Sequence, residues 1–131
     1  IALINFGARL NECLIAQKNL VKKGINITLA DARFVKPLDE NLIWQLATDH
    51  EAIITIEEGS IGGFGSHVGQ FLTDKNLLDN NLKFRSMILP DRFIDHDKPN
   101  LMYKYAGLDA NSIEGKILDI LNSKVIIKKT N

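Results

Sequence analysis

The glycine-rich stretch Gly62-Gly63-Phe64-Gly65-Ser66-His67-Val68-Gly69 is the part of the sequence most suggestive of chemistry. Gly63, Gly65 and Gly69 have a spacing close to that of a dinucleotide-binding loop, whose backbone N–H groups approach a pyrophosphate at a helix start. The stretch follows the third expected strand rather than the first. We therefore favour a packing role for these glycines, or a turn against another domain, over nucleotide binding. No Lys-Ser or Lys-Thr pair follows them, which excludes a P-loop.

Glu57 and Glu58 stand just before this loop, at the end of an expected strand. Paired carboxylates can share a proton or bind a metal ion. Adjacent strand residues point to opposite faces of a sheet, so these two do not form a ready dyad. We expect a structural role, in which one of them caps a helix N-terminus or meets a base from a neighbouring domain.

A third polar stretch, Asp91-Arg92-Phe93-Ile94-Asp95-His96-Asp97, follows the fourth expected strand. Arg92 is suited to a phosphate or carboxylate ligand, but an interdomain loop with locally paired charges is the favoured interpretation. The three histidines, His50, His67 and His96, have no metal-binding spacing. Ser66 with His67 is not a nucleophile elbow, because Gly-x-Ser-x-Gly is absent.

Strand-like and helix-like segments alternate along the chain. We expect strands at 1–6, 25–31, 52–57 and 84–89 and helices at 8–23, 39–47, 62–73, 101–105 and 111–121. Asp39 is expected to cap the second helix, and Asn111 or Asp109 the last. This order predicts βαβ units in a three-layer α/β/α fold with a mostly parallel sheet. The domain is expected to span residues 1–123, with 124–131 as a tail that is either a docked strand or a loose end.

Composition indicates a single ordinary globular domain. The chain has 131 residues, 45% of them apolar and 24% charged, with 16 basic residues against 16 acidic ones. Balanced charge argues against nucleic-acid binding, and no apolar run has the length of a membrane span. The single cysteine, Cys13, lies among Leu10, Leu14, Leu20 and Val21 at helical spacing and is expected in the core.

The opening run Ile1–Phe6 predicts a buried strand of a parallel sheet. It has no initiator Met and no signal-peptide pattern. We therefore expect the chain to be one domain of a larger cytosolic enzyme.

Several motifs resemble, in the same order, those of transketolase-type C-terminal domains. Asp31-Ala32-Arg33-Phe34-Val35-Lys36-Pro37-Leu38-Asp39 is similar to one signature, and the segment Glu57–Ser66 to a second. Leu89-Pro90-Asp91-Arg92-Phe93-Ile94, followed by Gly107-Leu108-Asp109-Ala110, is similar specifically to the 1-deoxy-D-xylulose-5-phosphate synthases. The resemblance covers about residues 1–121. The β subunits of 2-oxoacid dehydrogenases share the first two signatures and usually lack the Leu-Pro-Asp-x-Phe-Ile element.

The resemblance implies a bacterial or plastid enzyme that joins pyruvate to glyceraldehyde 3-phosphate with release of carbon dioxide. The product feeds isoprenoid, thiamine and pyridoxal synthesis. Thiamine diphosphate and Mg²⁺ are expected in the full-length enzyme, held by upstream domains, and a homodimer is implied. This chain lacks the Gly-Asp-Gly and Asn-Asn signature of such cofactor sites. In this family the C-terminal domain mainly supports the middle domain and the dimer.

No catalytic, cofactor-binding or metal-binding residue is therefore expected in this chain, and its partners are the upstream domains. An apolar surface is expected near the glycine loop and the Phe93-Ile94 loop. The candidates for interdomain, dimer or anion contacts are Glu57, Glu58, Gly62, Gly63, Gly65, Ser66, Asp91, Arg92, Phe93 and His96. The alternatives are the equivalent C-terminal domain of a 2-oxoacid dehydrogenase β subunit or of a transketolase, and a stand-alone nucleotide-binding or anion-binding module.

Overall fold

The structure, a computed structural model, describes the backbone of residues 1–130 and the side chains of residues 1–122. Its elements in chain order are β1 (Ala2–Phe6), α1 (Leu10–Lys22), β2 (Thr28–Ala32), α2 (Glu40–Asp49), β3 (Ala52–Glu57), α3 (Phe64–Asp74), β4 (Lys83–Met87), α4 (Pro99–Ala106) and α5 (Ala110–Thr130). The alternation predicts parallel strands joined by helical crossovers, and this is the arrangement found.

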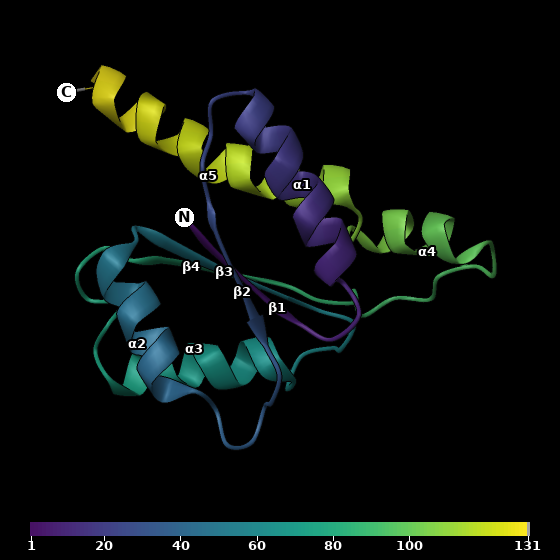
Figure 1. The fold of residues 1–131 in the computed structure, drawn as a ribbon, viewed down its shortest axis with the longest axis horizontal. Coiled ribbons are helices and arrows are strands. Elements are labelled where there is room, and N and C mark those ends of the chain that lie inside the picture. The colour runs from purple at the N-terminus through teal and green to yellow at the C-terminus, as the bar shows by residue number, and fades with distance from the viewer. Residues whose placement is uncertain (131) are drawn as a thin grey trace.

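The four strands form one parallel sheet in the order β2-β1-β3-β4. Helices α1 and α5 cover one face of the sheet, and α2 and α3 cover the other (Figure 1). The expected three-layer α/β/α fold is confirmed. All strands run in the same direction, so the loops after β1, β2, β3 and β4 meet at one edge, which we call the carboxyl edge.

Alternation along the central strands distributes side chains between two cores. Leu3, Ile54 and Ile56 face α1 and α5, whereas Ile4 and Ile53 face α2 and α3. All five are fully buried. A strand buried on both faces reads as a continuous apolar run, which is why the expectations for β1 and β3 are met almost to the residue.

Carboxylate side chains accept hydrogen bonds from backbone amides in the first turns of α2 and α5. Asp39 Oδ1 accepts a hydrogen bond from Leu42 N at 3.0 Å at the start of α2, as expected. Asp109 Oδ1 accepts from Ser112 N at 3.1 Å, so Asp109 rather than Asn111 caps α5. Glu12, from α1, accepts a second α5 amide, Ala110 N, at 2.9 Å. Side-chain oxygens at these positions satisfy N–H groups that have no partner within the helix.

A buried carboxylate also joins α1 to α5. Glu114 on α5 accepts a hydrogen bond from Asn19 Nδ2 at 2.8 Å and pairs with Lys23 Nζ at 3.1 Å. The hydrogen bond from Asn19, supported by Lys23, lowers the pKa of Glu114. This contact ties the helix that follows β1 to the last helix of the chain.

Helix α1 buries only part of its apolar surface. Cys13, Ala16 and Leu20 are buried, whereas Leu14 and Val21 are about half exposed. Burial raises the pKa of Cys13 to about 12, and its expected place in the core is confirmed. Cys13, Ala16 and Leu20 form the buried face of α1, and the neighbouring apolar residues Leu14 and Val21 lie outside it.

Several boundaries also differ from those expected. Strand β2 begins at Thr28 rather than Ile25, and β4 ends at Met87 rather than Leu89. The backbone of α5 is helical as far as Thr130, so the last residues of the chain up to that point are helical and do not form a docked strand. The domain division at residue 123 stays a prediction. No helix in the described part of the chain combines the length and apolar character needed to cross a bilayer.

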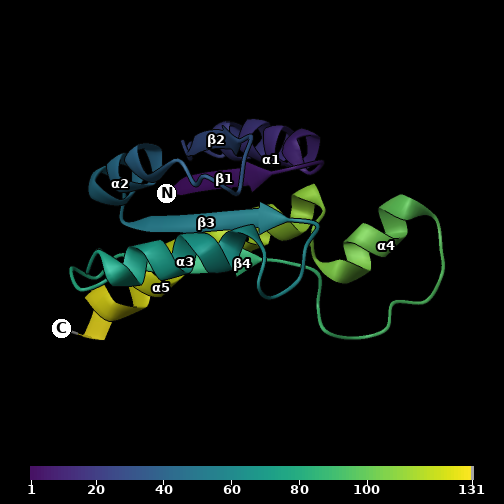
Figure 2. The same cartoon turned by 90° about the horizontal axis from the view of Figure 1, so that it is seen from below.

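Helix α4 projects beyond the carboxyl edge together with the loop that leads to it (Figure 2). None of its residues is fully buried. It ends at Gly107, whose left-handed backbone (φ 75°) turns the chain back toward the sheet.

Candidate functional site at the carboxyl edge of the sheet

The strand register determines which polar side chains meet at the carboxyl edge. Asn5 lies opposite Asp31 of β2, and Phe6 lies opposite Glu57 of β3. Ligands of open parallel sheets usually bind at this edge. The candidate site is therefore built from the last residues of the strands and the loops that follow them.

Glu57 is buried, with 3% of its surface exposed, and caps α3. Its Oε1 accepts a hydrogen bond from Phe64 N at 3.0 Å, and its Oε2 accepts one from Gly65 N at 2.6 Å. A carboxylate at a helix N-terminus satisfies amide donors and interacts favourably with the helix dipole. The expected capping role for one of the two glutamates is confirmed for Glu57.

The glycines of the loop make room for this carboxylate. A Cβ atom at Gly59 would lie 2.4 Å from Glu57 Oε1, and one at Gly63 would lie 2.1 Å from the same oxygen. Within the loop, Ser66 Oγ accepts a hydrogen bond from Gly62 N at 2.8 Å. The loop therefore packs around the carboxylate of Glu57, a group of the domain itself.

Two further glycines allow α3 to lie close to the sheet. A Cβ at Gly65 would come within 2.8 Å of Thr55 Oγ1 and 2.9 Å of Ser86 Cβ, and one at Gly69 within 3.0 Å of the Phe84 ring. On the same side, Phe64 stacks on Phe6 with 5.2 Å between ring centroids. The packing interpretation of the Gly-x-Gly-x-x-x-Gly spacing agrees with this geometry.

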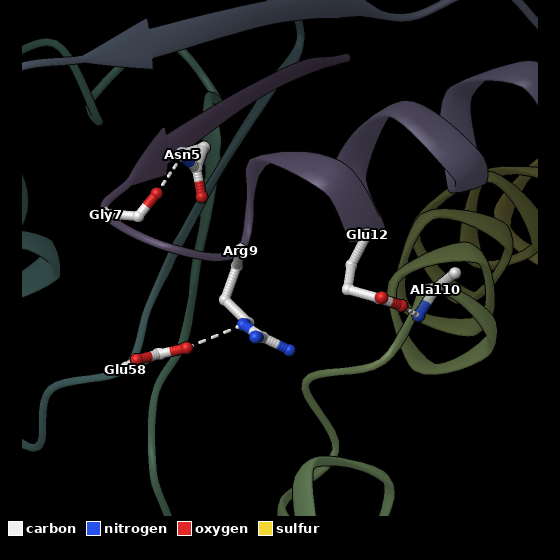
Figure 3. Close-up of polar contacts among 6 residues, drawn as sticks. All are labelled: Asn5, Gly7, Arg9, Glu12, Glu58 and Ala110. Carbon is white, nitrogen blue, oxygen red and sulfur yellow. Dashed lines mark hydrogen bonds and ion pairs between the residues drawn. The ribbon is translucent and has the colours of Figure 1, made fainter. Parts of the chain in front are cut away.

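Glu58 points away from Glu57, toward the start of α1. Its Oε1 pairs with Arg9 Nε at 2.8 Å (Figure 3). The Arg9 guanidinium also lies over the Tyr103 ring of α4, with Cζ 3.6 Å from the ring centroid. A hydrogen bond between the Tyr103 hydroxyl and Glu58 raises the pKa of Tyr103. The side chains of Glu57 and Glu58 lie on opposite faces of the sheet, so they do not form a dyad.

Asn5 forms a third polar contact, at the end of β1. Its Nδ2 donates to Asp31 Oδ1 at 2.8 Å. The same nitrogen donates to the Gly7 carbonyl at 3.0 Å (Figure 3). Asn5 is fully buried. These bonds connect the ends of β1 and β2 and fix the turn that leads into α1.

The polar loop after β4 is mostly solvent-exposed. Arg92 Nη2 donates to the Tyr105 carbonyl at 2.7 Å, which ties the loop to α4. Asp91, Phe93 and His96 are exposed. Binding of an anion by Arg92 stays a prediction.

Three large apolar side chains are exposed at this edge, each in a different loop. Phe34 follows β2 and is 68% exposed, Ile61 follows β3 and is 79% exposed, and Phe93 follows β4 and is 88% exposed. Exposed apolar side chains gathered on one side of a domain are typical of interaction surfaces. Ile61 and Phe93 are exposed apolar side chains in the two loops where apolar surface was expected, and Phe34 adds a third; a continuous apolar patch stays a prediction.

Sequence reasoning brought Glu57, Glu58 and the glycine loop together correctly but missed Asn5, Arg9 and Tyr103. The polar Asn5 inside an otherwise apolar strand was the available signal, because a buried amide needs a partner. Arg9 and Tyr103 gave no local signal, since they are far apart in the sequence. In the described residues no three His, Cys, Asp or Glu side chains gather where they could hold a metal ion.

Two comparisons with known proteins agree with this geometry. Residues 1–113 match the family model described as "Transketolase, C-terminal domain". A solved structure titled "Split gene transketolase, inactive beta4 tetramer" superposes with a TM-score of 0.78 over 92% of this chain, at 24% sequence identity. That likeness concerns the fold. The present chain spans 38% of the length of that chain.

Proposed function

The chain belongs to the transketolase C-terminal domain family, and we propose from this that it is a structural and assembly domain of a thiamine-diphosphate-dependent enzyme. The observation that carries the proposal is that the polar and the apolar side chains at the carboxyl edge have different surroundings. The carboxylates Glu57 and Glu58 are engaged within the domain, while Phe34, Ile61 and Phe93 are exposed. An edge with these properties is better suited to binding other protein surfaces than to catalysis.

The glycine loop does not fit the diphosphate of the cofactor. The amides of Phe64 and Gly65, which would bind a phosphate at the start of α3, already donate to Glu57. A phosphate placed there would meet this carboxylate, and two anions at one helix N-terminus repel each other. In this proposal the diphosphate and Mg²⁺ are held by other domains of the enzyme.

The same geometry disfavours the alternative of a nucleotide-binding module. Dinucleotide loops need free amides at the helix start, and in this loop they are occupied. An anion effector at Arg92 is not affected by this argument and stays an alternative.

For the full-length enzyme we propose a 1-deoxy-D-xylulose-5-phosphate synthase, which condenses pyruvate with glyceraldehyde 3-phosphate and releases carbon dioxide. Support comes from the motif Leu89–Ile94 and its partner Gly107–Ala110. The two motifs flank the projecting segment: Arg92 holds the carbonyl of Tyr105, Leu108 is buried, and Asp109 caps α5. A bacterial, cytoplasmic homodimer belongs to the same proposal.

A transketolase is the second candidate, because the superposed structure is titled a split-gene transketolase. The C-terminal domain of a 2-oxoacid dehydrogenase β subunit is a further possibility on the signatures at 31–39 and 57–66. The coding sequence upstream of Ile1 distinguishes these enzymes, because their cofactor-binding domains differ.

The test of the assembly role uses this chain by itself. We expect no turnover with thiamine diphosphate, Mg²⁺, pyruvate and glyceraldehyde 3-phosphate, and no calorimetric heat on titration with thiamine diphosphate. A chain that turned over both substrates would overturn the proposal. For the finer proposal, the full-length enzyme is assayed with the same substrates and with a ketose donor in place of pyruvate. Activity confined to the ketose donor would favour transketolase.

A further inference from the structure

The amino edge of the sheet, where the strands begin, contains a cavity that the candidate site does not use. Its volume is about 510 Å³. Ala52 and Lys83, the first residues of β3 and β4, form part of its wall. The C-terminal ends of α2 and α3 reach this edge from one face of the sheet, and α5 reaches it from the other (Figure 2). None of the lining residues that the structure describes belongs to the carboxyl edge, so the two sites are separate.

Two small residues account for the space. Ala47 of α2 and Ala52 of β3 are 9% and 1% exposed, and both line the cavity. A cavity of this volume is within the range of small-molecule sites, about 300–1,000 Å³, which are lined mainly by apolar side chains. The larger apolar residues of the wall are Leu77, Leu82, Ile120 and Leu121.

The loop between α3 and β4 adds amide side chains to this apolar wall. Asn80 and Asn81 line the cavity and are exposed. Asn81 has a left-handed backbone, with φ 64°, a conformation that is uncommon outside glycine and that asparagine adopts more readily than most residues. A side-chain amide supplies both a donor and an acceptor. A few polar groups beside an apolar wall are what orient a ligand in such sites.

The titratable side chains around the cavity favour a neutral ligand. Both ring nitrogens of His50 have partners, Thr28 Oγ1 at 2.7 Å and the Leu46 carbonyl at 2.9 Å, so this imidazole is part of the wall rather than a binding group. The other two titratable side chains of the described lining, Glu51 and Lys83, have opposite charges. An ion that entered the cavity would meet a like charge as well as an opposite one, and it would lose hydration.

We propose that the cavity at the amino edge binds a small neutral amphiphile. Its apolar body lies against Leu77, Leu82 and Leu121, and a hydroxyl or amide group at one end forms a hydrogen bond with the side chain of Asn81. This site is independent of the assembly role proposed above and adds a ligand-binding function to the domain.

The test begins with 1-octanol as the probe, titrated into the ¹⁵N-labelled chain and followed by NMR. We expect saturable shifts of the backbone amides at 47–52, 77–83 and 120–121, with a dissociation constant of about 1 mM or lower. Octanoate and octylammonium have the same chain length with a negative or a positive end. Both should bind more weakly than the alcohol.

Two matched variants test the hydrogen bond. Asn81→Gly removes the amide and keeps the backbone, because glycine adopts a left-handed conformation without strain. It should bind 1-octanol about three- to tenfold more weakly. Asn76→Gly makes the same change at another left-handed asparagine, with φ 57°, which does not line the cavity. This control should bind the alcohol like the wild type.

A third variant, Ala47→Leu, tests the cavity itself. The longer side chain should fill the space and abolish the saturable shifts, while a dispersed amide spectrum shows that the variant is folded. The wild-type titration is then repeated on the full-length enzyme, where the alcohol should bind with the same affinity.

Any of five outcomes would overturn the inference. The first two are an absence of saturable shifts up to the solubility limit of 1-octanol, and shifts centred on the carboxyl-edge loops. The others are an ion that binds as tightly as the alcohol, an Asn81→Gly variant that binds like the wild type, and a full-length enzyme that does not bind the alcohol. The assembly role fails separately, if the isolated chain binds the cofactor or turns over substrate.

Discussion

At the scale of single residues, Glu57 is the side chain on which the carboxyl edge most depends. It satisfies two amides at the start of a buried helix and occupies the space left by Gly59 and Gly63. Removing the Glu57 carboxylate leaves the amides of Phe64 and Gly65 without a hydrogen-bond acceptor. The cost of an unsatisfied buried donor is about 1–3 kcal/mol.

We therefore expect Glu57→Ala to lower the free energy of unfolding by roughly 2–4 kcal/mol. Urea unfolding followed by circular dichroism measures the change. Asp119→Ala, at an exposed position of α5, is the control and should change stability by less than about 0.5 kcal/mol. Equal stability of the two variants would show that the cap contributes little.

Sequence reasoning worked for residues whose role depends on their neighbours in the chain. Asp39 caps the helix that begins one residue later, and Glu57 caps a helix that begins seven residues later. The contacts of Arg9 with Glu58 and Tyr103 join three segments distant in sequence. Such pairings depend on the packing of α4 against the start of α1, for which a single sequence contains no pattern.

At the scale of the elements, the glycines show how closely α3 approaches the sheet. Gly65→Ala would press a methyl group against Thr55 and Ser86. We expect a loss of about 1–3 kcal/mol, as for other overpacked cores, measured by thermal or urea unfolding.

Gly115→Ala is the matched control, because it too adds one methyl group to a helix. A Cβ at Gly115 meets no atom within 4 Å, and alanine is favoured over glycine inside helices by about 0.8–1 kcal/mol. This variant should gain stability while Gly65→Ala loses it. The same sign for both would contradict a packing role for Gly65.

The contact between α1 and α5 predicts a dependence on pH. The folded state lowers the pKa of Glu114, so the ionised carboxylate contributes stability above its unfolded pKa of about 4.3, and this contribution is lost as the pH falls through the folded value. Glu114→Gln should therefore be less stable than the wild type, by about 1–2 kcal/mol, near pH 7.

The difference between Glu114→Gln and the wild type should shrink as the pH is lowered below about 4. Unfolding curves collected from pH 3 to pH 7 measure it. Glu40→Gln, in the exposed first turn of α2, is the control for loss of a surface carboxylate. A difference independent of pH would show that charge on Glu114 does not matter for the α1–α5 contact.

Element boundaries were less predictable than element order. The apolar runs of β1 and β3 are unambiguous because both of their faces are buried, whereas β2 and β4 lie at the sides of the sheet and have exposed residues. In α1, Leu14 and Val21 look like core residues in a helical pattern but are exposed. Hydrophobicity predicts which residues favour burial, and the neighbouring elements decide which of them are covered.

At the scale of the whole molecule, order of elements and parallel topology follow from the alternation of strands and helices, and the shared carboxyl edge follows from the topology. The projection of α4 beyond the sheet does not follow from the topology. Its amphipathic sequence predicts a helix, but none of its residues is fully buried, so the fold alone does not determine what it contacts.

The domain division predicts that a chain ending at Ser123 still folds. The described core side chains of α5, Ile113, Ile117 and Ile120, precede this point, so we expect the shortened chain to keep a single cooperative unfolding transition. Differential scanning calorimetry measures it against the complete chain. Loss of the transition would show that residues 124–131 belong to the domain.

The capped glycine loop has a consequence for communication within an assembled enzyme. A loop that is ordered by an external anion changes its shape when the anion leaves, and a neighbouring surface can sense that change. Here the anion is Glu57, which is covalently part of the loop's own strand and never dissociates. We therefore expect the loop that carries Ile61 to keep the same conformation whether or not an anion is present in solution, and to offer a fixed shape to any surface that contacts it.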